Sequence, residues 1–384
     1  MKVIHLIVIL ILIQFDLFSQ NNIIFSEDFE IANKQELTKK WKETSNLARM
    51  NLSSEKPPSS LGSKSLMMVF NADRPIVSHL FKSFDKGYNQ LFARFYCKFS
   101  NNHSAISQFV KLGCYNPLSE YSQLDFNILP NGSDRFSGGP IVRSDFSSWD
   151  LSANWMGMKV NPDSGVLSNQ FKSNPAIAAN TNKWYCIEFM LKINDPVSSS
   201  NGELALWIDG RKVMHLGQGF PNGYWENHNF FPSTDNSAFE GFQWRADDNM
   251  KINYFWFLYY IKNASPGKTD TMWVDDIVLS TNYIGPIGGS NIYEDKKESE
   301  ITVNYNHRTN SLSIIGLDNE ELIQELKLFN LLGQNILNLS YSKEILTSNS
   351  ELLFNQISLE KGLYFVYVKT SKKEFYSKLF NNPY

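Results

Sequence analysis

The stretch Trp184-Tyr-Cys-Ile-Glu-Phe-Met-Leu-Lys-Ile-Asn194 is followed, after a polar connection, by Gly202-Glu-Leu-Ala-Leu-Trp-Ile-Asp-Gly-Arg-Lys-Val-Met-His215. Both runs alternate with the two-residue period of a β-strand, with apolar side chains on one face and mostly polar or aromatic ones on the other. Asp209-Gly210 favours a tight hairpin turn, because glycine adopts positive φ without a Cβ clash. The pattern predicts hairpin-paired strands in a sheet with one buried face, as a β-sandwich requires.

Within this stretch, Trp-x-Cys-x-Glu, Lys-x-Asn and Asn-Gly-Glu-Leu-x-Leu-Trp-x-Asp-Gly together resemble the central hairpin of concanavalin A-like jelly rolls. The resemblance is to the secreted alginate- and glucuronan-lyase-like group in particular. It implies an all-β jelly-roll sandwich in which one sheet packs on its partner and presents a groove to a polysaccharide.

Other strand-length runs, separated by Asn, Gly, Ser and Pro clusters, support an all-β chain. They occupy residues 65–70, 77–84, 91–99, 107–115, 124–128 and 252–261. Acidic strands at 23–30 and 271–280 are expected to pair, as the first and last strands of a jelly roll do. Residues 131–180 are rich in Gly, Ser, Asn and Pro, and predict long loops.

The composition fits a secreted binding protein better than a nucleic-acid-binding one. Aromatic residues make up 14% of the 384 residues, which leaves some rings for stacking on sugars. The net charge of −3 provides no general attraction for nucleic acid or an anionic membrane, so a polyanion would need a local basic patch.

Residues 1–19 predict an export signal, with Lys2 before the apolar run 3–13 and Ser19 at the cleavage point. No other run approaches the roughly 20 apolar residues of a membrane helix, so we expect no transmembrane segment in the mature chain. The three cysteines, Cys97, Cys114 and Cys186, are an odd number. We expect them to be buried small side chains rather than the organising disulfides.

A Gly/Ser-rich and then charged linker at 288–300 separates a first domain, 20–287, from a small β-domain, 301–384. In the latter, Leu326-Lys-Leu-Phe-Asn-Leu-Leu-Gly-Gln334, Ile357-Ser-Leu-Glu-Lys-Gly-Leu-Tyr-Phe-Val-Tyr-Val368 and Lys378-Leu-Phe380 resemble the C-terminal sorting domain of the type IX secretion system. The family's usual opening Asn-Pro turn is absent from 304–311. The resemblance implies a Bacteroidota-type cell, contact with the type IX secretion machinery, and a secreted or cell-surface protein. The alternative is a small structural β-sandwich.

Run 91–99 carries the first candidate site residues. Its alternation places Arg94, Tyr96 and Lys98 on one face and Leu91, Phe95 and Cys97 among the core positions. Arginine binds carboxylates through two parallel hydrogen bonds, and tyrosine stacks on sugars or transfers a proton. The alternative is that the cations only solvate an exposed face.

The next run supplies Lys111, whose Lys111-Leu-Gly113 resembles a shortened Gly-Lys-Leu-x-Gly groove motif of the alginate-lyase-like family. Trp207 lies on the polar face of the central hairpin, so we expect it to converge with Arg94, Tyr96, Lys98 and Lys111 on one concave sheet. Further candidate sugar-binding residues are Gln243, Arg245 and Tyr254. Run 252–261 is aromatic or apolar on both faces, and the pattern does not decide which face Tyr254 joins.

These residue types favour β-elimination from a uronate polymer. That reaction requires a group that neutralises the carboxylate and a base for the C5 proton. Arg94 or Lys111 would neutralise, and Tyr96, Tyr254 or His103 would act on the proton. The competing hypothesis is a non-catalytic lectin-like module or surface adhesin of the same fold.

Hydrolysis is disfavoured because no groove strand carries the paired carboxylates of the Glu-x-Asp-x-x-Glu type. A zinc site is also disfavoured, since the histidines at 79, 215 and 228 have no Cys or His at ligand spacing. Glu27, Asp28, Asp275 and Asp276, on the two terminal strands, could hold a structural Ca²⁺ or could be ordinary surface acids.

Overall fold

The computed structural model describes residues 22–75, 77–118, 128–160 and 168–287 of a first compact unit. Of a second it describes 302–306, 309–315, 323–330, 334–340, 351–354, 357–360, 362–371 and 374–381. The units divide between Asn291 and Ile292. The predicted signal 1–19, linker 288–300 and most of the strand 124–128 lie outside the described residues. Within the described residues, no helix is both long enough and apolar enough to cross a membrane.

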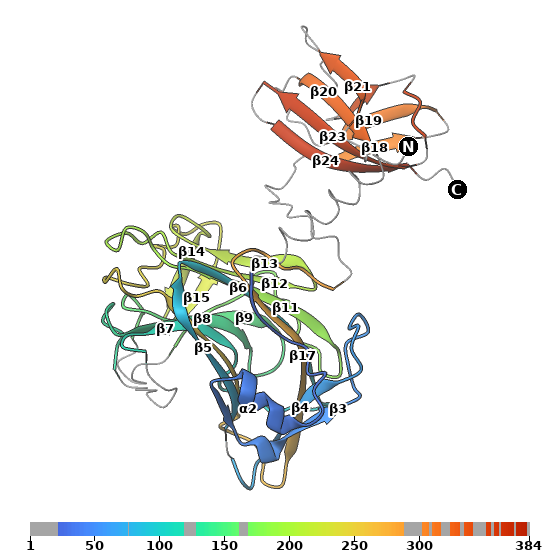
Figure 1. Cartoon of the computed structure of the whole chain (residues 1–384). Coiled ribbons are helices and arrows are strands. Elements are labelled where there is room, and N and C mark those ends of the chain that lie inside the picture. The colour runs from blue at the N-terminus through green and yellow to red at the C-terminus, as the bar shows by residue number, and fades with distance from the viewer. Residues whose placement is uncertain are drawn as a thin grey trace. The chain divides into compact units, whose positions relative to one another are not determined.

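The first unit contains two large sheets (Figure 1). Among its described residues, eight strands form one sheet, in the order β13 (Arg211–Leu216), β12 (Glu203–Ile208), β11 (Tyr185–Lys192), β6 (Gln90–Phe99), β17 (Thr269–Ser280), β4 (Ser65–Asn71) and β3 (Met50–Ser53), with β1 (Ile23–Glu27) also beside β17. The antiparallel pairing of β1 with β17 confirms that the terminal strands lie side by side. β11, β12 and β13 form the predicted hairpins, and Asp209 and Gly210 both have positive φ in the turn.

Nine strands of the described chain form the opposing sheet. Their order is β14 (Gly223–Glu226), β15 (Asn229–Pro232), β10 (Asn169–Phe171), β9 (Trp149–Asn154), β8 (Arg135–Val142), β7 (Lys111–Tyr115), β16 (Ile252–Tyr259), β5 (Ser78–Tyr88) and β2 (Glu43–Ser45). The prediction of long loops over 131–180 is therefore wrong for β8, β9 and β10. Glycines and serines obscure the strand pattern in this part of the sequence. Two of the glycines, Gly138 and Gly139, lie where a Cβ would crowd neighbouring atoms.

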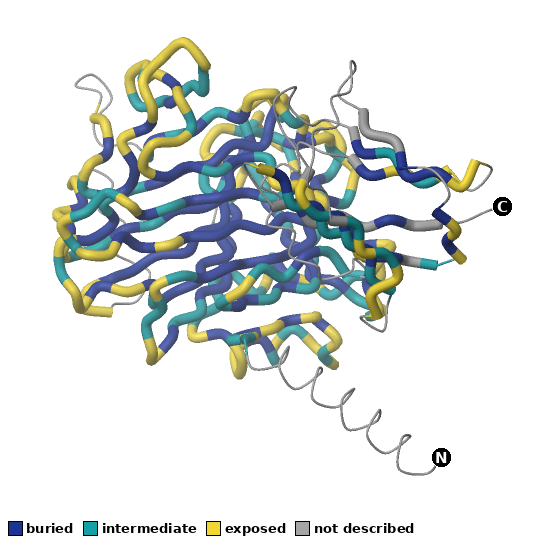
Figure 2. Tube along the Cα trace, turned by 90° about the horizontal axis from the view of Figure 1, so that it is seen from above, coloured by how far each residue is buried: buried dark blue, intermediate teal, exposed yellow. Residues whose placement is uncertain are grey.

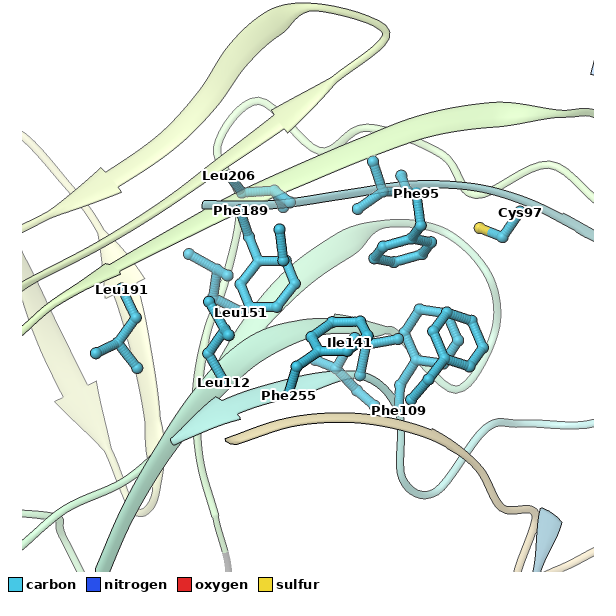
Figure 3. Close-up of a cluster of buried hydrophobic side chains, with 14 of the residues drawn as sticks. Phe95, Cys97, Phe109, Leu112, Ile141, Leu151, Phe189, Leu191, Leu206 and Phe255 are labelled. Carbon is cyan, nitrogen blue, oxygen red and sulfur yellow. The ribbon is translucent and has the colours of Figure 1, made fainter. Parts of the chain in front are cut away.

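The two sheets are held together by apolar side chains on their facing surfaces. Figure 3 shows Phe95, Phe189 and Leu206 from the eight-stranded sheet above Leu112 and Phe255 from the nine-stranded sheet. Fully burying each such side chain stabilises the fold by about 1.5–3 kcal/mol. The buried parts of the strands run through the middle of this unit, and exposed positions gather at the loops (Figure 2).

The two-sided aromatic strand β16 contributes alternate side chains to two different layers. Phe255, Phe257 and Tyr259 belong to the core between the sheets. Tyr254, Trp256 and Leu258 belong to a separate cluster with Phe81 and Tyr115. The question that the sequence left open is thereby decided: Tyr254 lies on the outer face of the nine-stranded sheet.

The second unit is a small β-sandwich with a core of its own. In its described part, one sheet has the order β18 (Thr302–Asn306), β19 (Ser311–Ile315), β22 (Glu351–Phe354), and the other the order β21 (Asn335–Ser340), β20 (Ile323–Asn330), β23 (Gly362–Thr370), β24 (Glu374–Asn381). Leu312, Leu328 and Val368 are among the side chains buried between the sheets. The chain is thus all-β: a large jelly-roll sandwich and a small C-terminal sandwich.

Candidate functional site

The residues predicted to converge on one groove lie on two different sheets. Arg94, Tyr96 and Lys98 belong to β6 and Trp207 to β12, in the eight-stranded sheet, whereas Lys111 belongs to β7 of the opposing sheet. The predicted convergence is wrong. Its physical reason is that the chain crosses from one layer to the other after β6, so that neighbouring runs in the sequence do not become neighbouring strands.

Arg94 and Tyr96 are covered by residues 281–287, which follow β17 and are called the strap below. The guanidinium of Arg94 donates to the carbonyl oxygens of Gly285 and Asp276, at 3.3 and 3.2 Å. The hydroxyl of Tyr96 accepts a hydrogen bond from the backbone N–H of Ile287 at 2.8 Å. Both side chains are buried, so they hold the strap rather than present themselves to a ligand.

Glu188 of β11 anchors the same strap, and the sequence did not single it out. Its carboxylate accepts hydrogen bonds from the N–H groups of Ile284 and Gly285, at 2.7 and 2.8 Å. Burial raises the pKa of Glu188 to about 7, although these two bonds and the charge of Arg94 act in the opposite direction.

Lys98 and Trp207 also make contacts within the eight-stranded sheet. Lys98 forms an ion pair with Glu55 at 3.1 Å and lies over the ring of Trp273. The ring of Trp207 packs against Phe92 and Tyr283, with centroid distances of 5.9 and 5.3 Å.

Gln243 and Arg245 secure loops. The Arg245 side chain is 4% exposed, and its guanidinium donates to the carbonyl oxygens of Asn194, Asp248 and Met250. Gln243 donates to the carbonyl oxygen of Val197 at 2.7 Å. These bonds explain both side chains without a ligand.

His103, the third candidate for proton transfer, lies in an aromatic cluster with Phe99, Phe146 and Tyr259. Its Nε2 atom lies 2.6 Å from the hydroxyl of Tyr259, a core residue. Burial lowers the pKa of His103.

The four carboxylates proposed for calcium do not form one group. Glu27 accepts hydrogen bonds from Trp41 Nε1 and the N–H of Phe29, at 3.1 and 3.2 Å. Asp275 and Asp276 lie where the β17 register is irregular, and burial, followed by the charge of Asp276, raises the pKa of Asp275 to about 7. Across the described ranges, no three His, Cys, Asp or Glu residues are placed to hold a metal. The expected calcium therefore stays a prediction, which can be tested at Asp275.

A second set of polar side chains occupies the outer face of the nine-stranded sheet, and Lys111 is at its centre. Lys111 lies directly opposite Trp256 of β16 and donates from Nζ to the hydroxyl of Ser152 on β9, at 2.9 Å. Gly139 of β8 lies between them in the register. Burial lowers the pKa of Lys111 to about 8.

Tyr254 lies two residues before Trp256 on β16 and therefore on the same face of the sheet, in the next row of paired residues. It lies opposite Gly113, whose missing side chain leaves room for the tyrosine hydroxyl. The ring stacks on Tyr115 with a centroid distance of 4.9 Å, and the hydroxyl is hydrogen-bonded to Ser137. Burial raises the pKa of Tyr254 well above its usual value, so the phenol stays protonated at physiological pH.

Polar side chains continue along this outer face across β9 and β10, where they surround the buried carboxylate of Asp150. Asp150 forms a two-point ion pair with Arg143, both distances being 3.1 Å, and a further pair with Lys172 at 3.4 Å. Lys172 also donates to Gln170, which lies opposite Ser152. Two cations thus surround one carboxylate here, which leaves one positive charge in excess.

We call the following set the polar face: Lys111, Ser137, Asp150, Ser152, Asn154, Gln170, Lys172 and Tyr254. Lys111 and Tyr254 were predicted from the sequence as site residues, and the others were not, because they fall in the region predicted as loops. The usable signal was the alternation of Trp149-Asp-Leu-Ser-Ala-Asn154, which places Asp150, Ser152 and Asn154 on one side of a strand.

Comparisons with known proteins find distant similarities. No protein-family model matches the chain, and neither does any curated protein. Solved structures similar to it include alginate lyase vAL-1 from Chlorella virus, at 11% identity and a TM-score of 0.46, over 68% of this chain and 100% of that one. The glycoside hydrolase family 131 catalytic domain from Coprinopsis cinerea aligns at 11% identity and a TM-score of 0.33, over 69% and 96%. Cellulose induced protein Cip1 aligns at 15% identity and a TM-score of 0.35, over 62% and 87%. At these values a shared activity does not follow.

Proposed function

We propose that this protein binds an extracellular acidic polysaccharide on the polar face and cleaves it by β-elimination at a uronate residue. The observation that carries the proposal is the position of Lys111, which is hydrogen-bonded to Ser152 and one row from Tyr254 on a neighbouring strand. A lysine and a tyrosine in adjacent rows provide two proton-transfer groups on one face of a rigid sheet.

The two groups suit the two proton transfers of the reaction. An efficient general base has a pKa near the operating pH. The Lys111 amine has a pKa of about 8, so Lys111 would remove the C5 proton. Tyr254, kept protonated by burial, would donate its proton to the leaving oxygen on C4. The C5–H and C4–O bonds break, and a C4–C5 double bond forms. Lys172 and Arg143 supply positive charge near the uronate carboxylate.

The test is a screen of the purified protein on alginate, glucuronan and a neutral glycan, which follows both binding and the ultraviolet absorbance of the unsaturated product. We expect product from a uronate polymer alone. Tyr254→Phe should abolish product while it leaves binding nearly intact, because only the proton donor is removed. Normal product formation by both Tyr254→Phe and Lys111→Met would refute the catalytic site.

One observation favours the lectin-like alternative. The Lys111 residue is only 6% exposed, so a substrate carbon has little direct access to its amine. If the wild-type protein binds a uronate polymer and releases no unsaturated ends, the polar face is a binding surface without catalysis.

We also propose that the protein is exported in two stages and ends outside the outer membrane. The N-terminal signal at 1–19 supports the first stage. The type IX-like motifs of 301–384 support the second, and these motifs fall in a unit that has its own core. Its partners would be the secretion machinery and an extracellular polysaccharide.

A further inference from the structure

Two aromatic rings stack at the edge of the nine-stranded sheet, far from Lys111. Tyr224 of β14 lies directly opposite Phe231 of β15, and the rings are stacked at a centroid distance of 5.5 Å with an interplanar angle of 19°. Tyr224 is 45% exposed. Their neighbours in the strands, Trp225 and Phe230, pack against the core instead. Tyr224 and Phe231 therefore lie on the outer face, and we call them the aromatic platform.

The aromatic platform continues the polar face without a break. β15 runs parallel to β10, and the N–H of Lys172 donates to the carbonyl oxygen of Phe230 at 2.9 Å. Lys172 and Phe231 are thus neighbours on the same outer face. The order along the sheet is the Lys111–Ser152 bond, then Gln170 and Lys172, then the platform.

This arrangement has the chemistry of a sugar subsite. A pyranose ring has one face of C–H groups that packs on an aromatic ring, and hydroxyls at its rim that need hydrogen-bond partners. The exposed Tyr224 ring offers the stacking surface, and Lys172 lies beside its partner Phe231, with Asn229 two residues before Phe231 on the same strand. The Tyr224 ring, on the edge strand β14, is exposed and belongs to none of the buried clusters of the described residues, so core packing does not account for it.

We infer that Tyr224 and Phe231 stack on a distal sugar of the same polysaccharide whose chain passes Lys111, so that the protein engages long chains in preference to short oligosaccharides. This inference rests on the proposed function. From β7 to β15 there are four strand spacings, a separation of about 19 Å. Because each sugar of a 1,4-linked polymer advances the chain by about one strand spacing, the platform lies about four sugars from Lys111.

The experiment compares polymeric alginate and glucuronan with their purified trisaccharides, on the full-length protein. Tyr224→Ala and Phe231→Ala should each weaken polymer binding by about tenfold, the scale of one stacked ring, and change trisaccharide binding less than twofold. Lys111→Met, which removes the proposed base, should abolish product while it leaves polymer binding nearly intact. Phe220→Ala is the matched control, since it removes an exposed ring that packs on His215 of the eight-stranded sheet.

Each outcome decides between the two proposals. If Tyr224→Ala and Phe231→Ala bind polymer as the wild type does, the platform is overturned and the site at Lys111 stands. If they lose polymer binding while Lys111→Met and Tyr254→Phe both form product normally, the platform stands and the proposed function falls. A wild-type protein that binds neither polymer overturns both.

Two measurements protect this result against trivial explanations. Thermal melting shows whether a variant is folded, and Phe231→Leu, which keeps apolar bulk but lacks a ring, replaces Phe231→Ala if the latter melts early. Light scattering shows the oligomeric state. A wild-type dimer that Tyr224→Ala converts to a monomer would overturn the inference in favour of contact with a second copy of this chain.

Discussion

Lys111 reaches Ser152 across an intervening strand, and its Nζ atom lies 2.9 Å from the serine hydroxyl. Gly139 occupies the crossing point on β8, where a Cβ would press against the backbone of Val110 and Lys111. The contact between a buried amine and a hydroxyl two strands away therefore depends on a residue without a side chain. The addition of a single methyl group at Gly139 therefore tests the packing at the centre of the polar face.

Gly139→Ala should lower the free energy of unfolding by about 1–3 kcal/mol, the usual cost of overpacking, because the new Cβ would meet a backbone carbonyl that has little freedom to move. Chemical denaturation measures this change. Gly362→Ala is the control, since the nearest described atom to a Cβ there is a ring carbon of Tyr364 at 3.9 Å. Equal stability of the two variants would show that β8 adjusts at no cost.

The pH dependence of product formation should identify the role of Lys111. The pKa of Lys111 is about 8, so a base at this position becomes active as pH rises through 8. Product formation should therefore rise between about pH 7 and 9. A fall over the same range would mean instead that the ammonium form neutralises the carboxylate. Lys111→Arg, which stays charged, should abolish this pH dependence of product formation in either case.

Lys111 should also destabilise the folded chain below pH 8. Burial lowers its pKa from the ordinary value of 10.5, so the unfolded state binds the proton more tightly and stability rises with pH between about 8 and 10.5. Lys111→Met should then melt at a higher temperature than the wild type at pH 7. A lower melting temperature would show that the bond to Ser152 outweighs the cost of burying the charge.

Glu188 should make stability fall as pH rises. Its pKa is about 7 in the folded chain against an ordinary value of 4.5, so between these pH values the unfolded state has already lost a proton that the folded state keeps. This group alone should lower the free energy of unfolding by about 3 kcal/mol across that range. Glu188→Gln should remove this contribution to the pH dependence of stability. Asp275, whose pKa is also about 7, should leave a residual slope. An unchanged slope would show that Glu188 titrates normally.

The fold was largely predictable from the sequence because the alternation of apolar side chains fixes which face of a strand is buried. Leu91, Phe95 and Cys97 all lie in the core, as predicted. Alternation also placed Arg94, Tyr96 and Lys98 together on the opposite face of β6. What it cannot show is which sheet a strand joins, and that choice separated Arg94 from Lys111.

The polar face escaped prediction for a related reason. Ser152 and Gln170 lie near Lys111 through the pairing of four consecutive strands, β7 to β10, and the last three of these lie in the region predicted as loops. Gly138 and Gly139 weaken the strand pattern of β8, yet they are required there for close packing. Likewise, nothing in the run 91–99 shows that the strap, almost 200 residues later, returns to cover Arg94.

The calcium prediction can be tested at Asp275 and Asp276, where the register of β17 is irregular. Asp275 is buried with an Oδ2 atom that has no hydrogen-bond partner among the described residues, and Asp276 has positive φ beside it. If a Ca²⁺ ion binds there, excess chelator should lower the melting temperature, because a ligand bound only to the folded state stabilises it. Asp275→Asn should abolish the effect. Identical melting curves in chelator and in excess Ca²⁺ would exclude the site.

Removal of residues 301–384 should block export without unfolding the first unit. The reason is that each unit has a separate apolar core, so the large sandwich loses none of its buried side chains in the truncation. In a host with type IX secretion, the truncated chain should accumulate in the periplasm in a protease-resistant form, whereas the full chain reaches the surface or the medium. Cell fractionation and surface proteolysis measure the difference. The matched control fuses 292–384 to the C-terminus of a periplasmic reporter, which should then appear outside the cell. Normal surface display of the truncated chain, or failure of the fused reporter to leave the periplasm, would show that 301–384 is a structural β-sandwich and not an export signal.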